Sequence, residues 1–297
     1  SLHDALPISA MFTMMNNARL GVGVEGVGVA EGATQAALDW ALARRQGRSP
    51  LPEGEGTGAI VDHADVRRML AAMRAETFAA RAIALSCAVA IDMATATGEA
   101  EWAARAALLT PIAKAWGTEV GHAVAQEAIQ VHGGMGYVEE TGVAQFARDV
   151  RVAAIYEGTN GIQAMDLVGR KLADGGEAAT NLIDEIQAGA EAARGALPEL
   201  AAPVWQAAET LREATEWMVE QPVQERFAGA LPYLRAFARV LGAHFHLSAA
   251  RAGGARHRAL AAVHVHRLLP EHEALLAEAR AGASGLYALS PDDLAAA

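Results

Sequence analysis

One glutamate in this chain stands where it could act as a general base. Glu157 follows the apolar pair Ile155 and Tyr156 and precedes a glycine-rich turn that opens a new helical pattern. Apolar surroundings disfavour the charged form of a carboxyl group, whereas the amide groups at the start of a helix favour negative charge nearby. Since these effects oppose each other, the stretch alone leaves open both a base and a solvated acid before an ordinary helix cap at Thr159 or Asn160.

A second stretch matches a nucleotide-binding pattern. Residues 21–26 (GVGVEG) fit the GxGxxG sequence of dinucleotide-binding folds. That pattern needs a strand before it and a helix after it, and residues 11–20 have helical periodicity instead. We therefore reject a dinucleotide site here. Glycines inside a helix reduce its stability, so we expect these glycines to permit the close approach of another backbone.

Six of the ten histidines lie between His244 and His272, which raises the question of a metal site. His244 and His246, like His264 and His266, are two residues apart, and on a helix this spacing turns the rings about 200° from each other. Metal ligands on one helix face are instead three or four residues apart. We predict no metal site and expect these side chains to lie on a solvated or partly packed face.

The composition narrows the class of protein. The 297 residues are 52% hydrophobic but only 5% aromatic, and they are rich in alanine, which favours helices. The formal net charge of -11 argues against binding of nucleic acid, which depends on clustered lysine and arginine. The single cysteine, Cys87, lies in an apolar helical run and fits a reducing compartment. Since no apolar run reaches the length of a membrane span and no signal peptide opens the chain, we predict a cytoplasmic protein.

Long helices must position the candidate residues. Helical segments joined by loops predict an all-α fold, an antiparallel four-helix bundle followed by a second helical domain. Asp62 is a candidate cap for the second helix of the bundle. The predicted segments of the bundle are helices over 11–45, 63–97, 99–132 and 159–174, a Gly/Pro-rich loop over 46–58, a short helix near 141–147 and an extended segment over 148–156.

The chain divides into three parts on this interpretation. Residues 1–10 carry no helical periodicity and are interpreted as an unrelated or disordered leader. Residues 11–173 form the bundle, and the sequence DGG at 174–176 marks the boundary. Residues 177–297 form the additional C-terminal helical domain, with helices predicted near 178–194, 203–220, 223–252 and 255–282.

Four motifs stand in a fixed order along the chain: MMNNARL at residues 14–20, RRQGR at 44–48, QVHGGMGY at 130–137, and RD at 148–149 leading into IYEGT at 155–159. Together they resemble the flavin-dependent acyl-CoA dehydrogenases, in the part that follows the middle β-domain of that family. The resemblance covers about residues 11–172, and the second helical unit looks like the extra C-terminal domain of the longer members. Because members begin with a helical domain and a β-domain, the chain resembles a C-terminal portion.

The resemblance implies that Glu157 is the catalytic base. It would remove the α-proton of an acyl-CoA thioester while the β-carbon delivers hydride to N5 of FAD. The backbone amide of the glutamate and a flavin ribityl hydroxyl would polarise the thioester carbonyl. Some relatives carry the base on an earlier helix, at the position of Ala18 here, and alanine cannot serve. The implied function is FAD-dependent oxidoreduction of acyl-CoA in fatty acid metabolism, with an electron-transfer flavoprotein as acceptor.

The resemblance also assigns binding residues. Glycines let backbone amides approach a pyrophosphate, and arginine suits its anionic oxygens. Gly161 departs from the glutamine that many relatives carry, so that flavin contact is not carried over. The residues matched to FAD binding are Arg44, Gln46, Gln130, Gly133, Gly134, Thr159 and Asn160, and those matched to the acyl-CoA substrate are Asn16, Arg19, Tyr156 and Gly158.

The resemblance implies a homo-oligomer, either a dimer or a tetramer. Arg44 and Gln130 belong to groups that reach a neighbouring subunit's FAD in this family. The alternative is a non-catalytic helical module of the same fold that keeps only the oligomer interface. On the first interpretation the chain by itself is incomplete, and we expect it to bind FAD weakly and to turn over no acyl-CoA.

Overall fold

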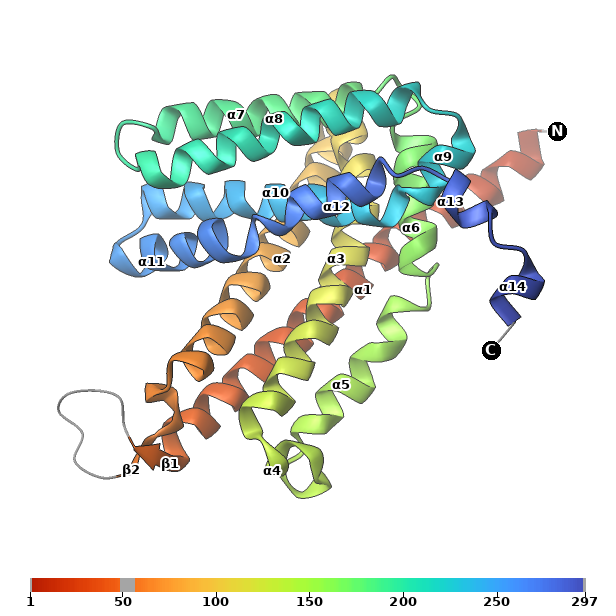
Figure 1. Ribbon diagram of the computed structural model, residues 1–297. Coiled ribbons are helices and arrows are strands. Elements are labelled where there is room, and N and C mark those ends of the chain that lie inside the picture. Colours follow the sequence, from red (N-terminus) through yellow and green to blue (C-terminus); the bar gives the residue numbers. More distant parts are fainter. Residues whose placement is uncertain (1, 49–56, 296–297) are drawn as a thin grey trace.

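Nearly all of the described chain is helical (Figure 1). The computed structural model describes the backbone of residues 2–48 and 57–295, and the side chains of residues 15–48 and 58–295. Within these ranges the strands number two and form one short antiparallel pair. The predicted all-α fold is therefore confirmed.

Long helices form the first half of the chain. The helices α1 (Leu2–Ala43), α2 (Ala64–Thr97) and α3 (Ala100–His132) contact one another, and α5 (Val143–Arg151) packs against α1 and α3. Successive helices run in alternating directions, as Figure 1 shows. The predicted positions of the second and third helices are confirmed to within one residue at each start.

Two predictions near the helix starts are wrong. α1 begins at Leu2 rather than near residue 11, because extending an existing helix adds one hydrogen bond for each residue fixed without a new nucleation step. The predicted cap Asp62 belongs to a short 3-10 turn, and His63 occupies the N-cap position of α2 without a capping side-chain hydrogen bond.

Gly23 and Gly26 of α1 lie directly against the backbone of α3. A Cβ atom at Gly23 would lie 2.5 Å from the carbonyl oxygen of Ala113, and one at Gly26 would lie 2.2 Å from that of Gly117. Real Cβ atoms do not approach other atoms within 3.0 Å, so a side chain at either position would push the helices apart. The predicted close approach of another backbone is confirmed for these two glycines.

The GxGxxG stretch therefore has a packing role. Residues 21–26 are helical throughout, so the rejection of a dinucleotide fold at this place is confirmed. Other glycines of α1 differ, because a Cβ atom at Gly21 or Gly28 would meet no atom within 4 Å. On α3, a Cβ atom at Gly121 would lie 2.7 Å from the carbonyl oxygen of Gly26, so the contact involves glycines of both helices.

Short elements connect the long helices. β1 (Arg45–Arg48) and β2 (Thr57–Ala59) pair at the two ends of the predicted Gly/Pro-rich loop, whose central residues 49–56 lie outside the described chain. Gly133, with a φ of 61°, ends α3 as predicted, and the short helix α4 (Gly134–Tyr137) follows it.

The predicted extended segment over residues 148–156 is wrong. α5 continues to Arg151, and a 3-10 turn (Val152–Ala154) follows it. The buried residues Val143, Ala147 and Val150 recur at helical spacing and face the core, so packing favours the helix in this segment.

The second half of the chain is a layer of shorter helices. The helix predicted near 178–194 is confirmed as α7. The next helix, α8, begins five residues before the predicted start because Pro198 suits the first turn of a helix. The two long helices predicted after it are interrupted, one at Gly229 and the other by a π-helical turn (His264–Leu268) and Pro270. The helices are α7 (Glu177–Ala193), α8 (Pro198–Glu220), α9 (Val223–Ala228), α10 (Ala230–Ala252), α11 (Ala255–Val263), α12 (Glu271–Ala279), α13 (Ser284–Tyr287) and α14 (Pro291–Ala295).

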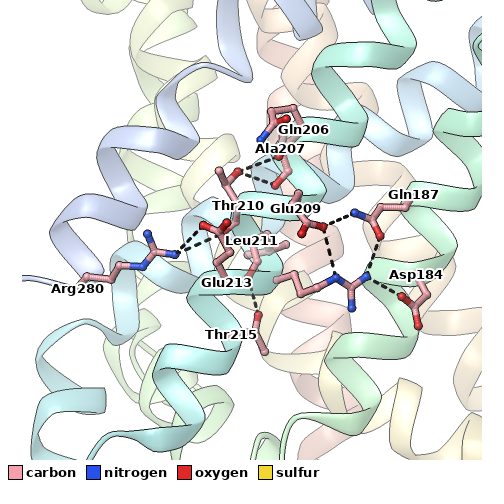
Figure 2. Close-up of polar contacts among 11 residues, drawn as sticks. Asp184, Gln187, Gln206, Ala207, Glu209, Thr210, Leu211, Glu213, Thr215 and Arg280 are labelled. Atoms are coloured by element: carbon pink, nitrogen blue, oxygen red, sulfur yellow. Dashed lines mark hydrogen bonds and ion pairs between the residues drawn. The ribbon is translucent and has the colours of Figure 1, made fainter.

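Polar side chains join α7 to α8. Arg212 of α8 donates hydrogen bonds to Asp184 (2.6 Å) and Gln187 (2.8 Å) of α7. Gln187 donates in turn to Glu209 of α8 at 2.7 Å, and Figure 2 shows these side chains facing one another. Such partly exposed links add little stability by themselves, so the apolar face between the helices carries most of their association.

α10 crosses the bundle and joins the two halves. It contacts α2, α3 and α7, and in Figure 1 it lies across one end of the long helices. Arg239 of α10 is 6% exposed and pairs with Glu76 of α2 and Glu271 of α12. Its guanidinium also lies 4.7 Å from the centre of the Trp116 ring of α3. Buried apolar residues of both halves form one continuous core.

α2 is apolar for a helix of its length. In the described part of the chain it is the one helix long and apolar enough to cross a membrane. A core helix of a bundle passes the same test, and α2 packs against α1, α3 and α10. Cys87 lies on its inner face, fully buried, with its sulfur 3.6 Å from the hydroxyl of Thr110.

The expectation of a solvated or partly packed face is wrong for four of the six C-terminal histidines, which are buried. His244, His246, His264 and His272 are buried among α10, the π-helical turn and α12. The rings of His246 and His264 lie 4.6 Å apart. No group of three potential metal-ligating side chains occurs among the described residues.

We predict that Gly26→Ala lowers the free energy of unfolding of this chain by about 3 kcal/mol, because the added methyl group must separate two helix backbones. Gly28→Ala is the matched control, with the same chemical change two residues along α1 in open space. It is expected to stabilise the chain by up to about 1 kcal/mol through helix propensity. Urea unfolding followed by circular dichroism measures both, and equal effects of the two variants would contradict the packing role.

We also predict that acid destabilises the chain through its buried histidines. Burial lowers the pKa of His246 from 6.5 to about 4, opposed by its hydrogen bond to the carbonyl oxygen of Ala75, and burial lowers the pKa of His264 further. Below about pH 6.5 the unfolded chain binds protons that the folded chain does not, so stability falls as the pH falls. Each such group contributes about 2 kcal/mol of loss between pH 7 and pH 5.

The test compares urea unfolding at these two pH values. Neither ring nitrogen of His264 has a hydrogen-bond partner in the described chain, so His264→Leu removes the titrating group without removing a hydrogen bond. We expect the pH-dependent loss to shrink by about 2 kcal/mol in this variant. It should stay the same in His266→Gln, a change at an exposed residue of the same turn. An unchanged loss in His264→Leu would rule out this role.

Candidate active site

Glu157 lies in a strained turn between the 3-10 turn after α5 and helix α6 (Asn160–Asp166). Its φ of 55° makes it the one residue other than glycine with a positive φ in the described chain, and Gly158 follows with a φ of 87°. A left-handed residue with a side chain costs roughly 1–2 kcal/mol, so the surroundings must hold it there. The hydroxyl of Thr159 accepts a hydrogen bond from the backbone N–H of Ile162 at 3.3 Å, which confirms the predicted cap.

Two side chains bind the carbonyl oxygens of this turn. The side-chain amide of Gln163 donates to the carbonyl oxygens of Glu157 (3.1 Å) and Gly158 (3.2 Å). The amine of Lys114, on α3, donates to the carbonyl oxygen of Gly158 at 2.9 Å and to the side-chain oxygen of Asn160 at 3.0 Å. Neither donor was predicted from the sequence, although a single lysine within the apolar run 106–116 was a signal that α3 faces a buried acceptor.

The surroundings of Glu157 differ from the expected apolar cover. Ile155 and Tyr156 are 52% and 37% exposed, so these neighbours do not bury the carboxylate. Glu157 is itself half-buried, and its charge acts on Lys114 and on Tyr156. The Tyr156 hydroxyl donates a hydrogen bond to Glu25 of α1, and this bond raises the pKa of Tyr156 to about 12. Tyr156 therefore ties the turn to α1.

The predicted substrate residue Arg19 is engaged inside the protein. It is 7% exposed, and its guanidinium lies 3.3 Å from the carboxylate of Asp166 on α6. The other oxygen of that carboxylate accepts a hydrogen bond from Arg170 at 2.6 Å. Asn16 is half-buried one turn earlier on α1. The structure thus brings Arg19 to the helix after Glu157, as part of a buried ion pair.

The predicted cofactor residues Thr159 and Asn160 line a cavity of about 620 Å³ at the seam of the two halves. Its walls come from α2, α3, the end of α5 and the turn after it, the start of α6, α10 and α12. The side-chain amide nitrogen of Asn160 donates to the carbonyl oxygen of Ala115 (3.3 Å) and the hydroxyl of Thr118 (3.1 Å). With Lys114 on its oxygen, this side chain is fully engaged within the protein.

The other predicted cofactor residues gather at the far end of the bundle. Arg44, Gln46, Gly133 and Gly134 line one pocket of about 590 Å³. Its walls also include the stacked rings of Trp40 and His132, 4.9 Å apart, and burial lowers the pKa of His132. Gln130 is exposed on α3 one turn before Gly133, whose amide donates to its carbonyl oxygen at 3.0 Å.

The predicted site residues therefore form two separate groups. Arg19 and Arg44 are 25 residues apart in the sequence. Arg19 lies on α1, which continues without a break to Ala43, the residue before Arg44. At 1.5 Å for each residue, this separation is about 37 Å. One group surrounds Glu157 and the other surrounds Gly133.

Comparison with known proteins assigns the chain to a family. The model of the acyl-CoA dehydrogenase C-terminal domain matches residues 8–172, and that of the acetyl-CoA dehydrogenase C-terminal-like domain matches residues 182–290. The chain belongs to the acyl-CoA dehydrogenase family. This family match carries the identification, because it covers more than half of the chain.

The regions that match relatives in this family include more than half of this chain but less than half of each relative's length. The 3-methylmercaptopropionyl-CoA dehydrogenase of Ruegeria pomeroyi is 41% identical over 238 residues, which are 75% of this chain and 40% of that protein. A butyryl-CoA dehydrogenase of Syntrophomonas wolfei is 38% identical over 169 residues, 55% of this chain and 28% of that protein.

Solved structures of acyl-CoA dehydrogenases share the fold. Caenorhabditis elegans ACDH-11 in complex with C11-CoA has a TM-score of 0.74 at 18% identity, covering 87% of this chain and 44% of its own. An acyl-CoA dehydrogenase of Bacillus anthracis complexed with FAD has a TM-score of 0.71 at 20% identity, covering 96% of this chain and 51% of its own. At these identities the likeness concerns the fold alone.

The buried ion pair predicts a structural role for Arg19. Arg19→Met should lower the free energy of unfolding by about 2 kcal/mol, because it removes the buried partner of the Asp166 carboxylate. The control is Arg170→Met on the other oxygen, where the arginine side chain is 61% exposed and the expected loss is about 0.5 kcal/mol or less. Urea unfolding of the two variants decides, and a harmless Arg19→Met would refute the structural role.

Proposed function

We propose that this chain is the helical C-terminal part of a flavin-dependent dehydrogenase that oxidises an acyl-CoA thioester between its α- and β-carbons. The observation that carries the proposal is Glu157 in a chain of this family. Its carboxylate belongs to a left-handed turn that precedes α6 and is bound to α1 through Tyr156. Ala18 leaves the earlier helix without a base. The C-terminal helical layer would accompany the catalytic bundle.

Glu157 performs the proton transfer in this proposal. Its carboxylate accepts the α-proton, while the electron pair of that C–H bond becomes part of the new α,β double bond. The backbone N–H of Glu157 faces the thioester carbonyl and favours the negative charge that develops on its oxygen. Tyr156 and Gly158 would line the thioester. Asn16 lies near the CoA chain, whereas Arg19 acts by holding α1 to α6 through Asp166.

FAD, when bound, supplies the acceptor for the hydride that leaves the β-carbon. The backbone at Gly133 and Gly134 suits an approaching diphosphate, because a Cβ atom at either glycine would meet no atom within 4 Å and the surface there is open. The exposed guanidinium of Arg44 and the amide of Gln46 border the same pocket. These four residues, with Gln130 beside them, would hold the adenosine diphosphate part of FAD. Thr159 and Asn160 would contact the flavin part.

The separation of the two groups supports a homo-oligomer. The group at Arg44 lies about 37 Å along α1 from the group at Glu157, so it would serve the cofactor of a neighbouring subunit. The proposed partners are accordingly a second copy of this chain, acyl-CoA, and an electron-transfer flavoprotein that reoxidises the cofactor. The chain spans 40% of the length of its Ruegeria relative, and we propose that turnover needs the remaining domains. We place the protein in the cytoplasm.

The proposal predicts that Glu157→Gln abolishes dehydrogenation but leaves cofactor binding unchanged. The variant is made in a polypeptide that joins this chain to the N-terminal helical domain and β-domain of the family. We expect the flavin absorbance to stay and the turnover of acyl-CoA with a dye acceptor to fall about a thousandfold, since glutamine cannot accept the α-proton.

Glu140→Gln is the control, because Glu140 is an exposed carboxylate in the 3-10 turn before α5. It should retain full turnover. Turnover of Glu157→Gln at the level of the unchanged protein would refute the assignment of the base.

A further inference from the structure

Lys114 is a buried amine with neutral partners. Its side chain is 0% exposed, and its described hydrogen bonds go to the carbonyl oxygen of Gly158 and the side-chain oxygen of Asn160. Burial lowers the pKa of Lys114 to about 8, and repulsion from Arg19 adds to the lowering. Buried lysines are rare unless a carboxylate pairs with them directly, and such a pair is not found for Lys114 among the described ion pairs. The charges of Glu119 and Glu157 act on Lys114 without pairing with it directly, so its hydrogen bonds go to neutral acceptors.

The Gly158 carbonyl belongs to the turn that carries Glu157. Two successive left-handed residues aim the carbonyl oxygens of Glu157 and Gly158 into the protein, where Gln163 and Lys114 donate to them. Gln163 lies on α6, the helix that follows the turn, whereas Lys114 lies on α3. Lys114 thus ties the turn to α3, as the hydrogen bond from Tyr156 to Glu25 ties it to α1.

We infer that Lys114 is a positioning residue for Glu157: its hydrogen bond to the Gly158 carbonyl fixes the left-handed turn and so directs the Glu157 carboxylate and amide. The inference rests on the proposed function only where it names Glu157 as the base. The hold on the turn is a property of this chain and can be measured without activity.

A positioning role and a structural role of Lys114 differ in whether its acceptors keep other donors when Lys114 is replaced. The Gly158 carbonyl keeps Gln163 as donor, and the Asn160 oxygen keeps the hydroxyl of Thr118 at 3.2 Å. No acceptor is left without a donor, so the cost of an unpaired buried acceptor is avoided, and the cost of burying a charged amine is removed together with the amine. The loss of Lys114 should therefore loosen the turn without unfolding the protein.

The first experiment measures hydrogen–deuterium exchange of the 297-residue chain with Lys114→Met. We expect amides in residues 156–161 to exchange roughly tenfold faster, with unchanged exchange in α1 and α2 and an unchanged or higher melting temperature. Thr118→Val is the matched control, since Thr118 also binds the Asn160 oxygen but does not touch the Gly158 carbonyl. It should leave the exchange of residues 157 and 158 unchanged.

Two results would overturn the inference. One is unchanged exchange of the turn in Lys114→Met, and the other is a lower melting temperature with faster exchange throughout, which would mark Lys114 as a structural residue. If the methionine variant does not fold, Lys114→Gln takes its place, because its amide is one atom nearer the backbone and cannot reach both acceptors. The same criteria apply to it.

The second experiment uses the polypeptide with all family domains. Lys114→Met should lower kcat about tenfold or more while KM and the flavin absorbance stay within about twofold, because only the geometry of the base changes. An unchanged kcat would refute the link to Glu157. If the unchanged protein shows no acyl-CoA turnover, the proposed function fails, and the exchange measurement still decides whether Lys114 holds the turn.

Discussion

The contact between the backbones of α1 and α3 is the constraint on which the rest of the structure depends. At Gly23, Gly26, Gly117 and Gly121 the two helices approach more closely than any side chain allows. Backbone contact fixes the register of the helices as well as their distance. It sets Glu25 and Arg19 of α1 beside the stretch of α3 that carries Lys114. The turn around Glu157 binds Glu25 and Lys114, whereas Arg19 binds Asp166 of the following helix α6. The candidate base is therefore positioned by residues of α1 and α3 that precede it by more than forty positions in the sequence.

The turn around Glu157 is unfavourable by itself and is maintained by its neighbours. A left-handed glutamate has no local preference in its favour, and the short helix α6 provides one cap and one amide side chain. The remaining hydrogen bonds come from α1 and α3. This arrangement stores strain at the position of the proposed base. It also means that the conformation of the turn reports on the packing of the bundle.

The sequence predicted the helical elements well, because alanine-rich periodicity and glycine at helix ends are local signals. Glu157, Arg44 and Gly133 were selected as candidates through motifs, which record residue types but not contacts. Long-range effects were missed. The partner of Arg19 lies 147 residues away, and neither its burial nor the hydrogen bonds of Lys114 follow from local periodicity. The exposure of Ile155 and Tyr156 and the burial of four histidines likewise depend on which helix covers which face, and that is a tertiary property.

The second helical layer is connected to the candidate site by polar groups as well as by the shared core. Glu119 of α3 accepts a hydrogen bond from Arg235 of α10 at 2.7 Å, and its other oxygen lies 3.4 Å from the side-chain nitrogen of Asn160. Asn160 in turn shares Lys114 with the Gly158 carbonyl. A contiguous set of hydrogen bonds is not by itself energetic coupling. The hydrogen bond from Arg235 does, however, neutralise the charge of Glu119. Without Arg235, the Glu119 carboxylate would compete with the Asn160 oxygen for the amine of Lys114. The arginine on α10 thus favours the arrangement in which Lys114 binds the turn.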